Sequence, residues 1–180
     1  AGIVGLGGAA FPSSVKLRPK TGQPIHTLIL NGAECEPYIT CDDMLMRGNA
    51  DRVITGARIL RHILGAGQVL VGIEDNKPEA IAAMREAVAA AGDARIQVVV
   101  IPTKYPSGGE KQLIRVLTGA EVPSHGIPAQ IGIVCQNVAT AAAVADAVVR
   151  GRPLISRLVT LTGGGIAEPC NLEVLIGTPA

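Results

Sequence analysis

The sequence has very few aromatic residues and no excess of either charge. Tryptophan is absent, and one phenylalanine and two tyrosines occur among 180 residues. The 16 Lys and Arg residues oppose 15 Asp and Glu residues, which leaves a formal net charge of +1. Aromatic platforms that stack bases and basic surfaces that follow a phosphate backbone are both disfavoured. We therefore expect no nucleic-acid partner.

Cysteine is also sparse. The four cysteines are Cys35, Cys41, Cys135 and Cys170, and no two of them have the C-x-x-C spacing. Zinc sites and iron–sulfur clusters usually take paired thiolates at short spacing, so we predict no metal site in these residues. Four cysteines are too few for a disulfide scaffold, and a reducing compartment is the better expectation.

Long apolar runs and a basic leader are missing as well. No stretch approaches the roughly 20 consecutive apolar residues that a membrane-spanning helix needs. The sequence opens with Ala-Gly-Ile-Val-Gly, without an initiator Met or a basic segment. We expect the chain to be a piece of a longer protein.

What the sequence does contain is an alternation of apolar runs and helical patterns. Strands are predicted over residues 27–30, 69–73, 96–101 and 131–134. Helices are predicted over residues 51–64, 78–91, 110–117 and 137–150. Predicted caps are Asn76, a capping box formed by Ser107 and Glu110, and Asn137. This order predicts an α/β fold in which helices cover a parallel sheet.

From about residue 153 the pattern changes. Residues 158–162 and 172–176 alternate in the manner of a β-hairpin, and a Gly-Gly-Gly turn lies between them. We place a domain boundary near residues 153–157. The prediction is a nucleotide-binding α/β domain over residues 1–152, followed by a truncated second module over residues 153–180.

The first candidate binding segment is rich in glycine. Gly5, Gly7 and Gly8 precede Phe11 and Lys16, and glycine lets a backbone approach a phosphate closely and offer it N–H groups. Lys16 adds a compensating charge. A tight glycine turn without a ligand is the alternative.

Three further polar segments follow predicted strands. Residues 31–37 include Asn31, Glu34 and Glu36; residues 104–111 include Gly109 and Glu110; residues 136–140 include Asn137 and Thr140. Ligands of open parallel sheets bind at the carboxyl ends of strands, where such loops converge. Each segment also has a structural explanation that needs no ligand: a polar turn for residues 31–37, the capping box for residues 104–111 and a helix N-cap for residues 136–140.

Together these segments resemble one family of flavoproteins. The resemblance rests on Gly-Leu-Gly-Gly-Ala-Ala-Phe-Pro at residues 5–12, Asn-Gly-Ala-Glu-Cys-Glu-Pro at 31–37, Tyr-Pro-Ser-Gly-Gly-Glu at 105–110 and Gln-Asn-Val-Ala-Thr at 136–140. These segments are similar to the flavin-binding domain shared by the C subunit of the Rnf electron-transport complex and the NADH-oxidising flavoprotein subunit of respiratory complex I. Residues 159–179 are similar to the start of the β-grasp module that follows in this family. Ala33, Lys111 and Leu17 depart from the complex I pattern and favour the Rnf branch.

The resemblance implies a Rossmann-like domain with non-covalent FMN and NAD(H). It places the FMN phosphate near Gly5–Gly8 and the Asn137–Thr140 helix start, with Lys16 nearby. It implies that Asn31 and Glu34 contact the ribityl or ring part. Phe11 and Glu36 are candidates on the nicotinamide side, and Glu110 is a candidate for contact with either ligand. Gly109 would let a dinucleotide lie against the start of the helix. The chemistry belongs to the cofactors, so no catalytic side chain is predicted.

The resemblance also implies a place in a larger assembly. Hydride exchange between NAD(H) and FMN would be followed by electron transfer to or from [4Fe–4S] clusters beyond residue 180. Partners would be the other subunits of an ion-translocating ferredoxin:NAD oxidoreductase, peripheral on the cytoplasmic side of a bacterial inner membrane. The alternatives are the FMN/NADH core of a soluble relative such as a cobalamin reductase, a dinucleotide sensor and a flavin-less docking scaffold.

Overall fold

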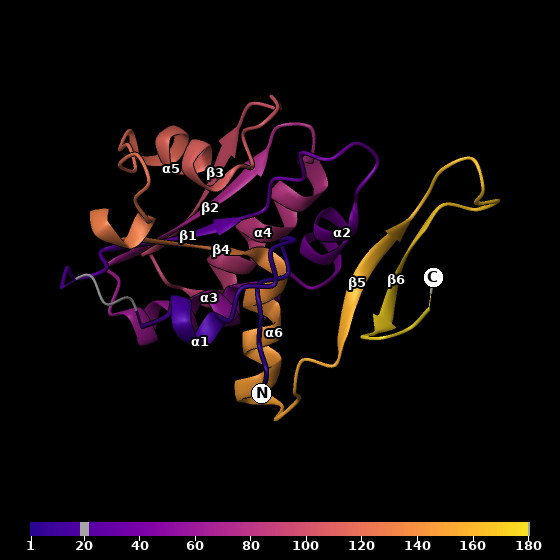
Figure 1. The fold of residues 1–180 in the computed structure, drawn as a ribbon, viewed down its shortest axis with the longest axis horizontal. Helices are drawn as coiled ribbons and strands as arrows, with labels where there is room; N and C mark the ends of the chain where they lie inside the picture. The colour runs from indigo at the N-terminus through magenta and orange to yellow at the C-terminus, as the bar shows by residue number, and fades with distance from the viewer. Residues whose placement is uncertain (19–21, 180) are drawn as a thin grey trace.

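A parallel four-stranded sheet forms the centre of the computed structural model, which describes residues 1–18 and 22–179 (Figure 1). Its strands are β1 (Thr27–Asn31), β2 (Gln68–Glu74), β3 (Ile96–Ile101) and β4 (Ile133–Asn137), in the order β3-β2-β1-β4. The chain builds the sheet outward from β1 to β3 and then returns to the other side of β1. The strand order therefore reverses between β1 and β4, where Asn31 lies opposite Asn137. Ligands of doubly wound folds bind at such a reversal.

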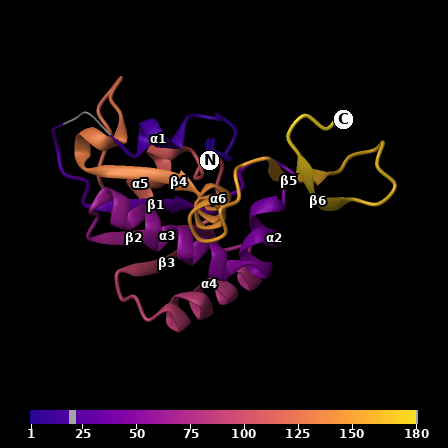
Figure 2. The ribbon, with the colours of Figure 1, turned by 90° about the horizontal axis from the view of Figure 1, so that it is seen from below.

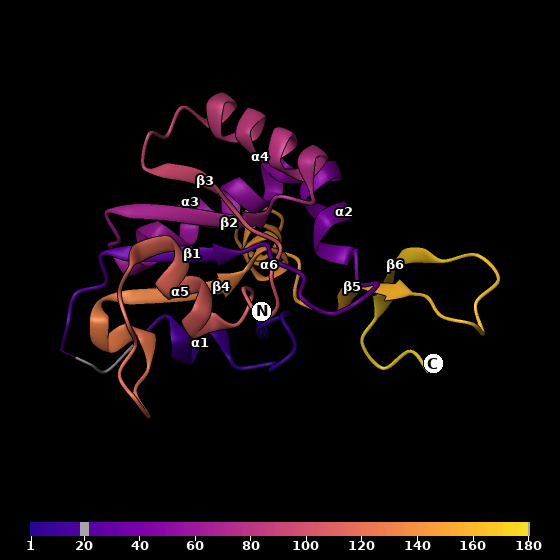
Figure 3. The ribbon, with the colours of Figure 1, turned by 90° about the horizontal axis from the view of Figure 1, so that it is seen from above.

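Helices cover both faces of the sheet (Figures 2 and 3). One face carries α2 (Cys41–Gly48), α3 (Ala50–Leu64), α4 (Pro78–Ala91) and α6 (Val138–Val149). Its core joins alternate strand residues such as Leu28 and Leu30 to α3 and α6. The other face carries α5 (Glu110–Thr118), whose Leu113 and Ile114 pack against Ile29. The short α1 (Ser13–Lys16) lies near β4. The predicted Rossmann-like α/β fold is confirmed.

Glycines end three of the predicted helices, within one residue of the predicted ends. Gly65, Gly92 and Gly119 take left-handed backbone conformations directly after α3, α4 and α5. Asn137 caps α6 by accepting hydrogen bonds from Ala139 N and Thr140 N, as predicted. Many helices end at a residue with a left-handed backbone conformation, and glycine adopts this conformation at little steric cost. Glycine is therefore a good indicator of a helix C-terminus.

Two predicted helix caps are wrong. Lys77, not Asn76, is the N-cap of α4, and its side chain points inward toward Glu34 and Glu74. The Ser107–Glu110 capping box does not form: Gly109 is the N-cap of α5, and the Ser107 hydroxyl donates to the carbonyl of Lys104.

Strand β4 also begins later than residue 131. Residues Pro128–Ile131 form a 3₁₀ helix that ends at the left-handed Gly132, and Ile133 starts the strand.

Beyond α6 the chain forms the predicted hairpin. Strands β5 (Ser156–Leu161) and β6 (Cys170–Leu175) pair antiparallel, with Ser156 opposite Leu175. The hairpin projects away from the parallel sheet and lies beside α2 (Figure 1). Thr40 N donates to Thr160 Oγ1 at 3.1 Å and Asn171 Nδ2 donates to Thr40 Oγ1 at 2.9 Å, so the loop before α2 holds the hairpin.

Across residues 1–18 and 22–179, none of the helices has both the length and the apolar character needed to span a membrane.

Candidate functional site

A cavity of about 1070 Å³ opens at the carboxyl ends of β1 and β4, where the strand order reverses. Four loops that are distant in sequence surround it, and they are the four polar segments that the sequence singles out. Of the predicted cofactor-binding residues, the following line the cavity: Gly5, Gly7, Gly8, Phe11, Lys16, Asn31, Glu34, Glu36, Gly109, Glu110 and Asn137. Thr140 lies directly behind the wall, fully buried.

The glycine-rich loop forms a closed turn over the start of α6. Gly5 N donates to the Phe11 carbonyl at 2.8 Å, and Gly8 takes a φ of 110° that favours glycine. A Cβ on Gly7 would lie 3.3 Å from Cβ of Asn137, so the loop backbone lies close to the helix start. No residue that the structure describes accepts a hydrogen bond from the N–H groups of Gly7 or Gly8. The loop therefore offers free donors beside a helix N-terminus, which is an arrangement that binds anions.

Asn137 and Thr140 tie this loop to α6. Asn137 Oδ1 accepts from Ala139 N at 2.8 Å and from Thr140 N at 3.3 Å. Thr140 Oγ1 accepts from Leu6 N at 2.9 Å. Thr140 thus positions the loop from behind, while Asn137 faces the cavity.

Lys16 and Glu110 meet at the cavity wall. Lys16 Nζ lies 2.6 Å from Glu110 Oε1, and the two side chains are 30% and 39% exposed. The carboxylate that the sequence assigns to a capping box is instead the partner of an ammonium from α1. The pair places one charge of each sign within reach of a ligand.

Asn31 and Cys35 fasten the second loop to the third. Asn31 Nδ2 donates to the Gly108 carbonyl at 2.8 Å, and its Oδ1 accepts from Ala33 N at 3.0 Å. Gly108 N donates to Cys35 Sγ at 2.9 Å. A Cβ on Gly108 would lie 2.6 Å from that sulfur, so this position requires glycine. Burial, followed by the negative charges of nearby glutamates, raises the pKa of the Cys35 thiol, which makes it a weak nucleophile.

Glu34 and Glu36 have different surroundings. The Glu34 carboxylate is buried, where it accepts from Asp42 N at 2.7 Å and Asp43 N at 3.1 Å, at the start of α2. Lys77 Nζ lies 3.4 Å from it. Glu36 is exposed at the rim of the cavity. Glu34 therefore shapes the wall through α2, whereas Glu36 is free to meet a ligand.

Sequence reasoning missed Asp42 and did not single out Gln136 within the 136–140 segment; both line the cavity. Asp42 Oδ2 accepts from Asn137 Nδ2 at 2.5 Å, and burial raises the pKa of Asp42 to about 7. Gln136 is buried, and its Nε2 donates to no described residue. The paired acids at residues 42 and 43 are typical of a first helical turn and could have indicated α2.

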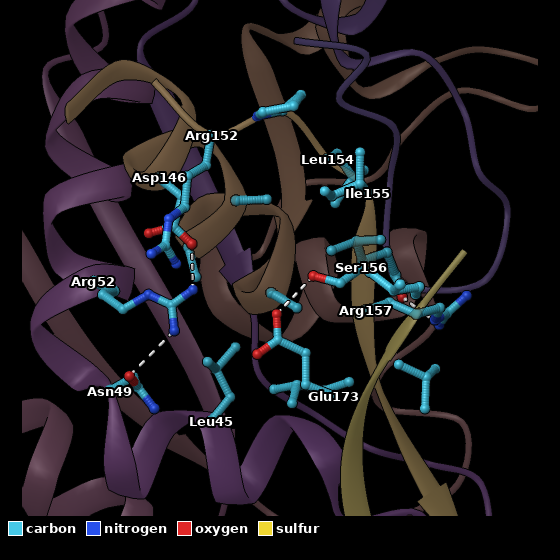
Figure 4. A pocket seen from close by; sticks show the side chains of 18 residues that line it. Leu45, Asn49, Arg52, Asp146, Arg152, Leu154, Ile155, Ser156, Arg157 and Glu173 are labelled. Atoms are coloured by element: carbon cyan, nitrogen blue, oxygen red, sulfur yellow. Dashed lines mark hydrogen bonds and ion pairs between the residues drawn. The ribbon is translucent and has the colours of Figure 1, made fainter. Parts of the chain in front are cut away.

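A second cavity, of about 650 Å³, lies between α3, α6 and the hairpin (Figure 4). Arg52 forms an ion pair with Asp146 and donates to Asn49 Oδ1 at 3.2 Å, and Ser156 donates to Glu173 at 2.6 Å. Within the described residues, none of the predicted cofactor-binding residues lines it.

The fold and the first cavity define a class of protein. A doubly wound sheet whose switch point carries a glycine loop, free backbone donors and a helix N-terminus is a nucleotide-cofactor domain of the Rossmann-like kind. The Nuo51 FMN-binding domain family matches residues 1–146. The chain belongs to this family, and the predicted resemblance to the C subunit of the Rnf complex and to its complex I relative is confirmed.

Individual relatives agree with this assignment. The chain is 61% identical over 179 residues to the C subunit of the ion-translocating oxidoreductase complex of Pseudomonas aeruginosa, covering 99% of this chain and 23% of that protein. It is 55% identical over 178 residues to the C subunit of the proton-translocating ferredoxin:NAD(+) oxidoreductase complex of Clostridium ljungdahlii, covering 99% and 38%. The chain thus spans less than two fifths of the length of these relatives.

A solved structure has the same fold. A chain of the NAD⁺-reducing [NiFe]-hydrogenase in its air-oxidised state superposes with a TM-score of 0.79 at 25% identity. The match covers 98% of this chain and 35% of that chain.

The cavity residues fit FMN on grounds of their own chemistry. The free N–H groups of Gly7 and Gly8 and the α6 N-terminus suit a phosphate. The buried, unpartnered Gln136 Nε2 offers a hydrogen bond to a polar ring atom. The cavity is also large enough for a ligand of this class.

Proposed function

We propose that this domain binds FMN non-covalently in the large cavity and exchanges hydride between NAD(H) and FMN. The observation that carries the proposal is the convergence of the glycine loop, the residue 31–36 loop, the residue 105–110 loop and the α6 N-terminus on one cavity. Bound FMN would supply the conversion between two-electron and one-electron transfer.

The chain's own residues would bind and orient the phosphate end. Gly7 and Gly8 offer free backbone donors, Gly5 closes the turn through its bond to the Phe11 carbonyl, and Asn137 holds the N-terminus of α6 beside them. Lys16 compensates the phosphate charge from α1. Thr140 keeps the loop against the helix.

The ring end would lie between the second and third loops. Asn31 faces the cavity with one amide hydrogen not used in its contact to Gly108. Glu34 shapes this wall by anchoring α2. The exposed Phe11 and Glu36 are available to a nicotinamide, and Gly109 gives a ligand access to Glu110. These side chains orient the two rings and exclude water from between them.

We further propose that the domain acts within a larger electron-transport complex. Support comes from the names of two relatives. One is the C subunit of an ion-translocating oxidoreductase complex, and the other is the C subunit of a proton-translocating ferredoxin:NAD(+) oxidoreductase complex. Electrons would pass to or from [4Fe–4S] clusters outside residues 1–180, with ferredoxin and the other subunits as partners. The protein would lie peripherally on the cytoplasmic side of the membrane.

The division into two domains is part of the proposal. Residues 1–152 would form the FMN/NADH domain, and residues 153–180 would begin a β-grasp module. The antiparallel β5–β6 hairpin supports the second part.

An anaerobic FMN titration of the full-length protein, followed by NADH, tests this function. We expect saturable binding and loss of flavin absorbance near its visible maximum on NADH addition. Thr140→Val removes the acceptor for Leu6 N and is expected to weaken FMN binding about tenfold, whereas Thr55→Val in α3, outside the cavity, leaves it unchanged. Binding without reduction by NADH would contradict the hydride step, and no FMN binding at all would contradict the whole proposal.

A further inference from the structure

Asp42 joins two of the segments that surround the large cavity. It lies in the first turn of α2, and its backbone N–H donates to Glu34 Oε1 at 2.7 Å. Its carboxylate Oδ2 accepts from Asn137 Nδ2 at 2.5 Å. One residue on a helix that lines the cavity therefore contacts both the loop after β1 and the helix start after β4.

The contact with Asn137 fixes the orientation of an amide. Because Nδ2 of Asn137 donates to Asp42, its Oδ1 must face α6, where it accepts from Ala139 N and Thr140 N. A rotated amide would set its own N–H groups against those of the helix, which is unfavourable. Thr140 in turn holds Leu6 N of the glycine loop, so the effect of Asp42 extends to that loop.

The contact with Glu34 anchors Asp42 itself. The Glu34 carboxylate accepts hydrogen bonds from the backbone N–H groups of Asp42 and Asp43, and Lys77 Nζ lies 3.4 Å from it. Glu34 N donates to Glu74 Oε2 at 3.3 Å. The start of α2 is thus held by a buried network behind the cavity, and Asp42 projects from it toward Asn137.

We propose that Asp42 is a positioning residue that holds Asn137 and the Glu34 loop in the one arrangement that binds the cofactor. The proposal rests on the proposed FMN function. It assigns Asp42 no part in hydride transfer.

Because Asp42 can ionise, the proposal predicts a pH dependence of FMN affinity that a purely structural role would not produce. Burial raises the pKa of Asp42 to about 7, and nearby Glu34 adds to the rise. The hydrogen bond from Asn137 and the charges of Lys77 and Arg157 act in the opposite direction.

The neighbouring thiol adds no charge near neutral pH, because burial raises the pKa of Cys41 to about 11. Asp42 is therefore mostly neutral at pH 6 and mostly charged at pH 8. A carboxylate that forms beside the cavity opposes an incoming phosphate, so FMN affinity should fall as the pH rises.

The test is FMN titration of the full-length protein at pH 6, 7 and 8, followed by flavin fluorescence. Asp42→Asn keeps an acceptor oxygen for Asn137 Nδ2 but cannot ionise. Asp42→Ala removes both the acceptor oxygen and the ionisable group. Asp51→Asn and Asp51→Ala, on the exposed first turn of α3, are the matched controls. The ionisation of the FMN phosphate affects every variant equally and cancels in the comparison.

Asp42→Asn should match the unsubstituted protein at pH 6 and bind FMN up to about tenfold more tightly than it at pH 8. Asp42→Ala should bind about tenfold more weakly than Asp42→Asn at each pH. The Asp51 variants should follow the unsubstituted protein throughout.

Two results would overturn the inference while the proposed function stands: Asp42→Ala binding FMN as the unsubstituted protein does, or Asp42→Asn losing as much affinity as Asp42→Ala at pH 6. Failure of the unsubstituted protein to bind FMN would instead overturn the proposed function, and this inference with it.

Discussion

Lys16 and Glu110 form an ion pair at the wall of the cavity where we place the cofactor. Their contact of 2.6 Å means that, before a ligand binds, the ammonium is already partly neutralised. A phosphate that enters must share Lys16 with Glu110. The two side chains should therefore have opposite effects on FMN affinity.

We predict that Lys16→Met weakens FMN binding about tenfold, because a charge-assisted contact is lost, and that Glu110→Gln leaves it equal or tighter. Titration with FMN and with riboflavin measures the difference, since the Lys16 effect should be confined to the phosphorylated ligand. Lys104→Met, at an exposed position outside the cavity lining, is the control. Equal losses in Lys16→Met and Glu110→Gln would contradict this reading of the pair.

At the scale of helices and strands, the sequence predicted most of the architecture. Apolar, β-branched runs identified the four parallel strands, and the glycines after α3, α4 and α5 marked where these helices end. The convergence of the four polar segments was also predictable, because parallel strands bring their carboxyl ends to one edge of the sheet.

The elements that escaped prediction depend on contacts made after the chain has folded. Helix α2 buries only a short stripe that includes Leu45 and Met46, and its N-terminus is stabilised by Glu34. Glu110 resembled a capping residue by spacing, yet its partner is Lys16, 94 positions away. Local patterns cannot reveal such partners, and the Asp42–Asn137 contact was hidden for the same reason.

Helices α3 and α6 pack closely through one glycine. A Cβ on Gly56 would lie 1.8 Å from the carbonyl oxygen of Ala141, so neither backbone can stay in place if a side chain is added. We predict that Gly56→Ala lowers the free energy of unfolding by roughly 3 kcal/mol, the cost of forcing packed helices apart.

Urea denaturation provides the measurement. Gly48→Ala, at the end of α2, is the control, since nothing lies within 4 Å of the added Cβ. It should be neutral or slightly stabilising, as alanine is favoured over glycine in helices. A Gly56→Ala protein as stable as the Gly48→Ala protein would show that α3 and α6 do not pack as described.

At the scale of the whole molecule, the hairpin contacts the α/β part of the chain next to the large cavity. Thr40, in the loop before α2, contacts both Thr160 and Asn171. Arg157 of β5 lines the cavity and donates to the Leu6 carbonyl at 3.4 Å. The β5–β6 hairpin therefore contributes a charged side chain to the rim of the large cavity.

Arg157 should accordingly add to phosphate recognition. We predict that Arg157→Gln weakens FMN binding about fivefold, near the upper end for an exposed charge pair, and leaves riboflavin binding unchanged. Raising the salt concentration should reduce the difference between the two proteins, because exposed charges are screened. Arg85→Gln, on the outer surface of α4, is the control and should bind both ligands normally. If Arg157→Gln loses affinity for riboflavin and FMN equally, Arg157 acts by holding the hairpin in place and not through its charge.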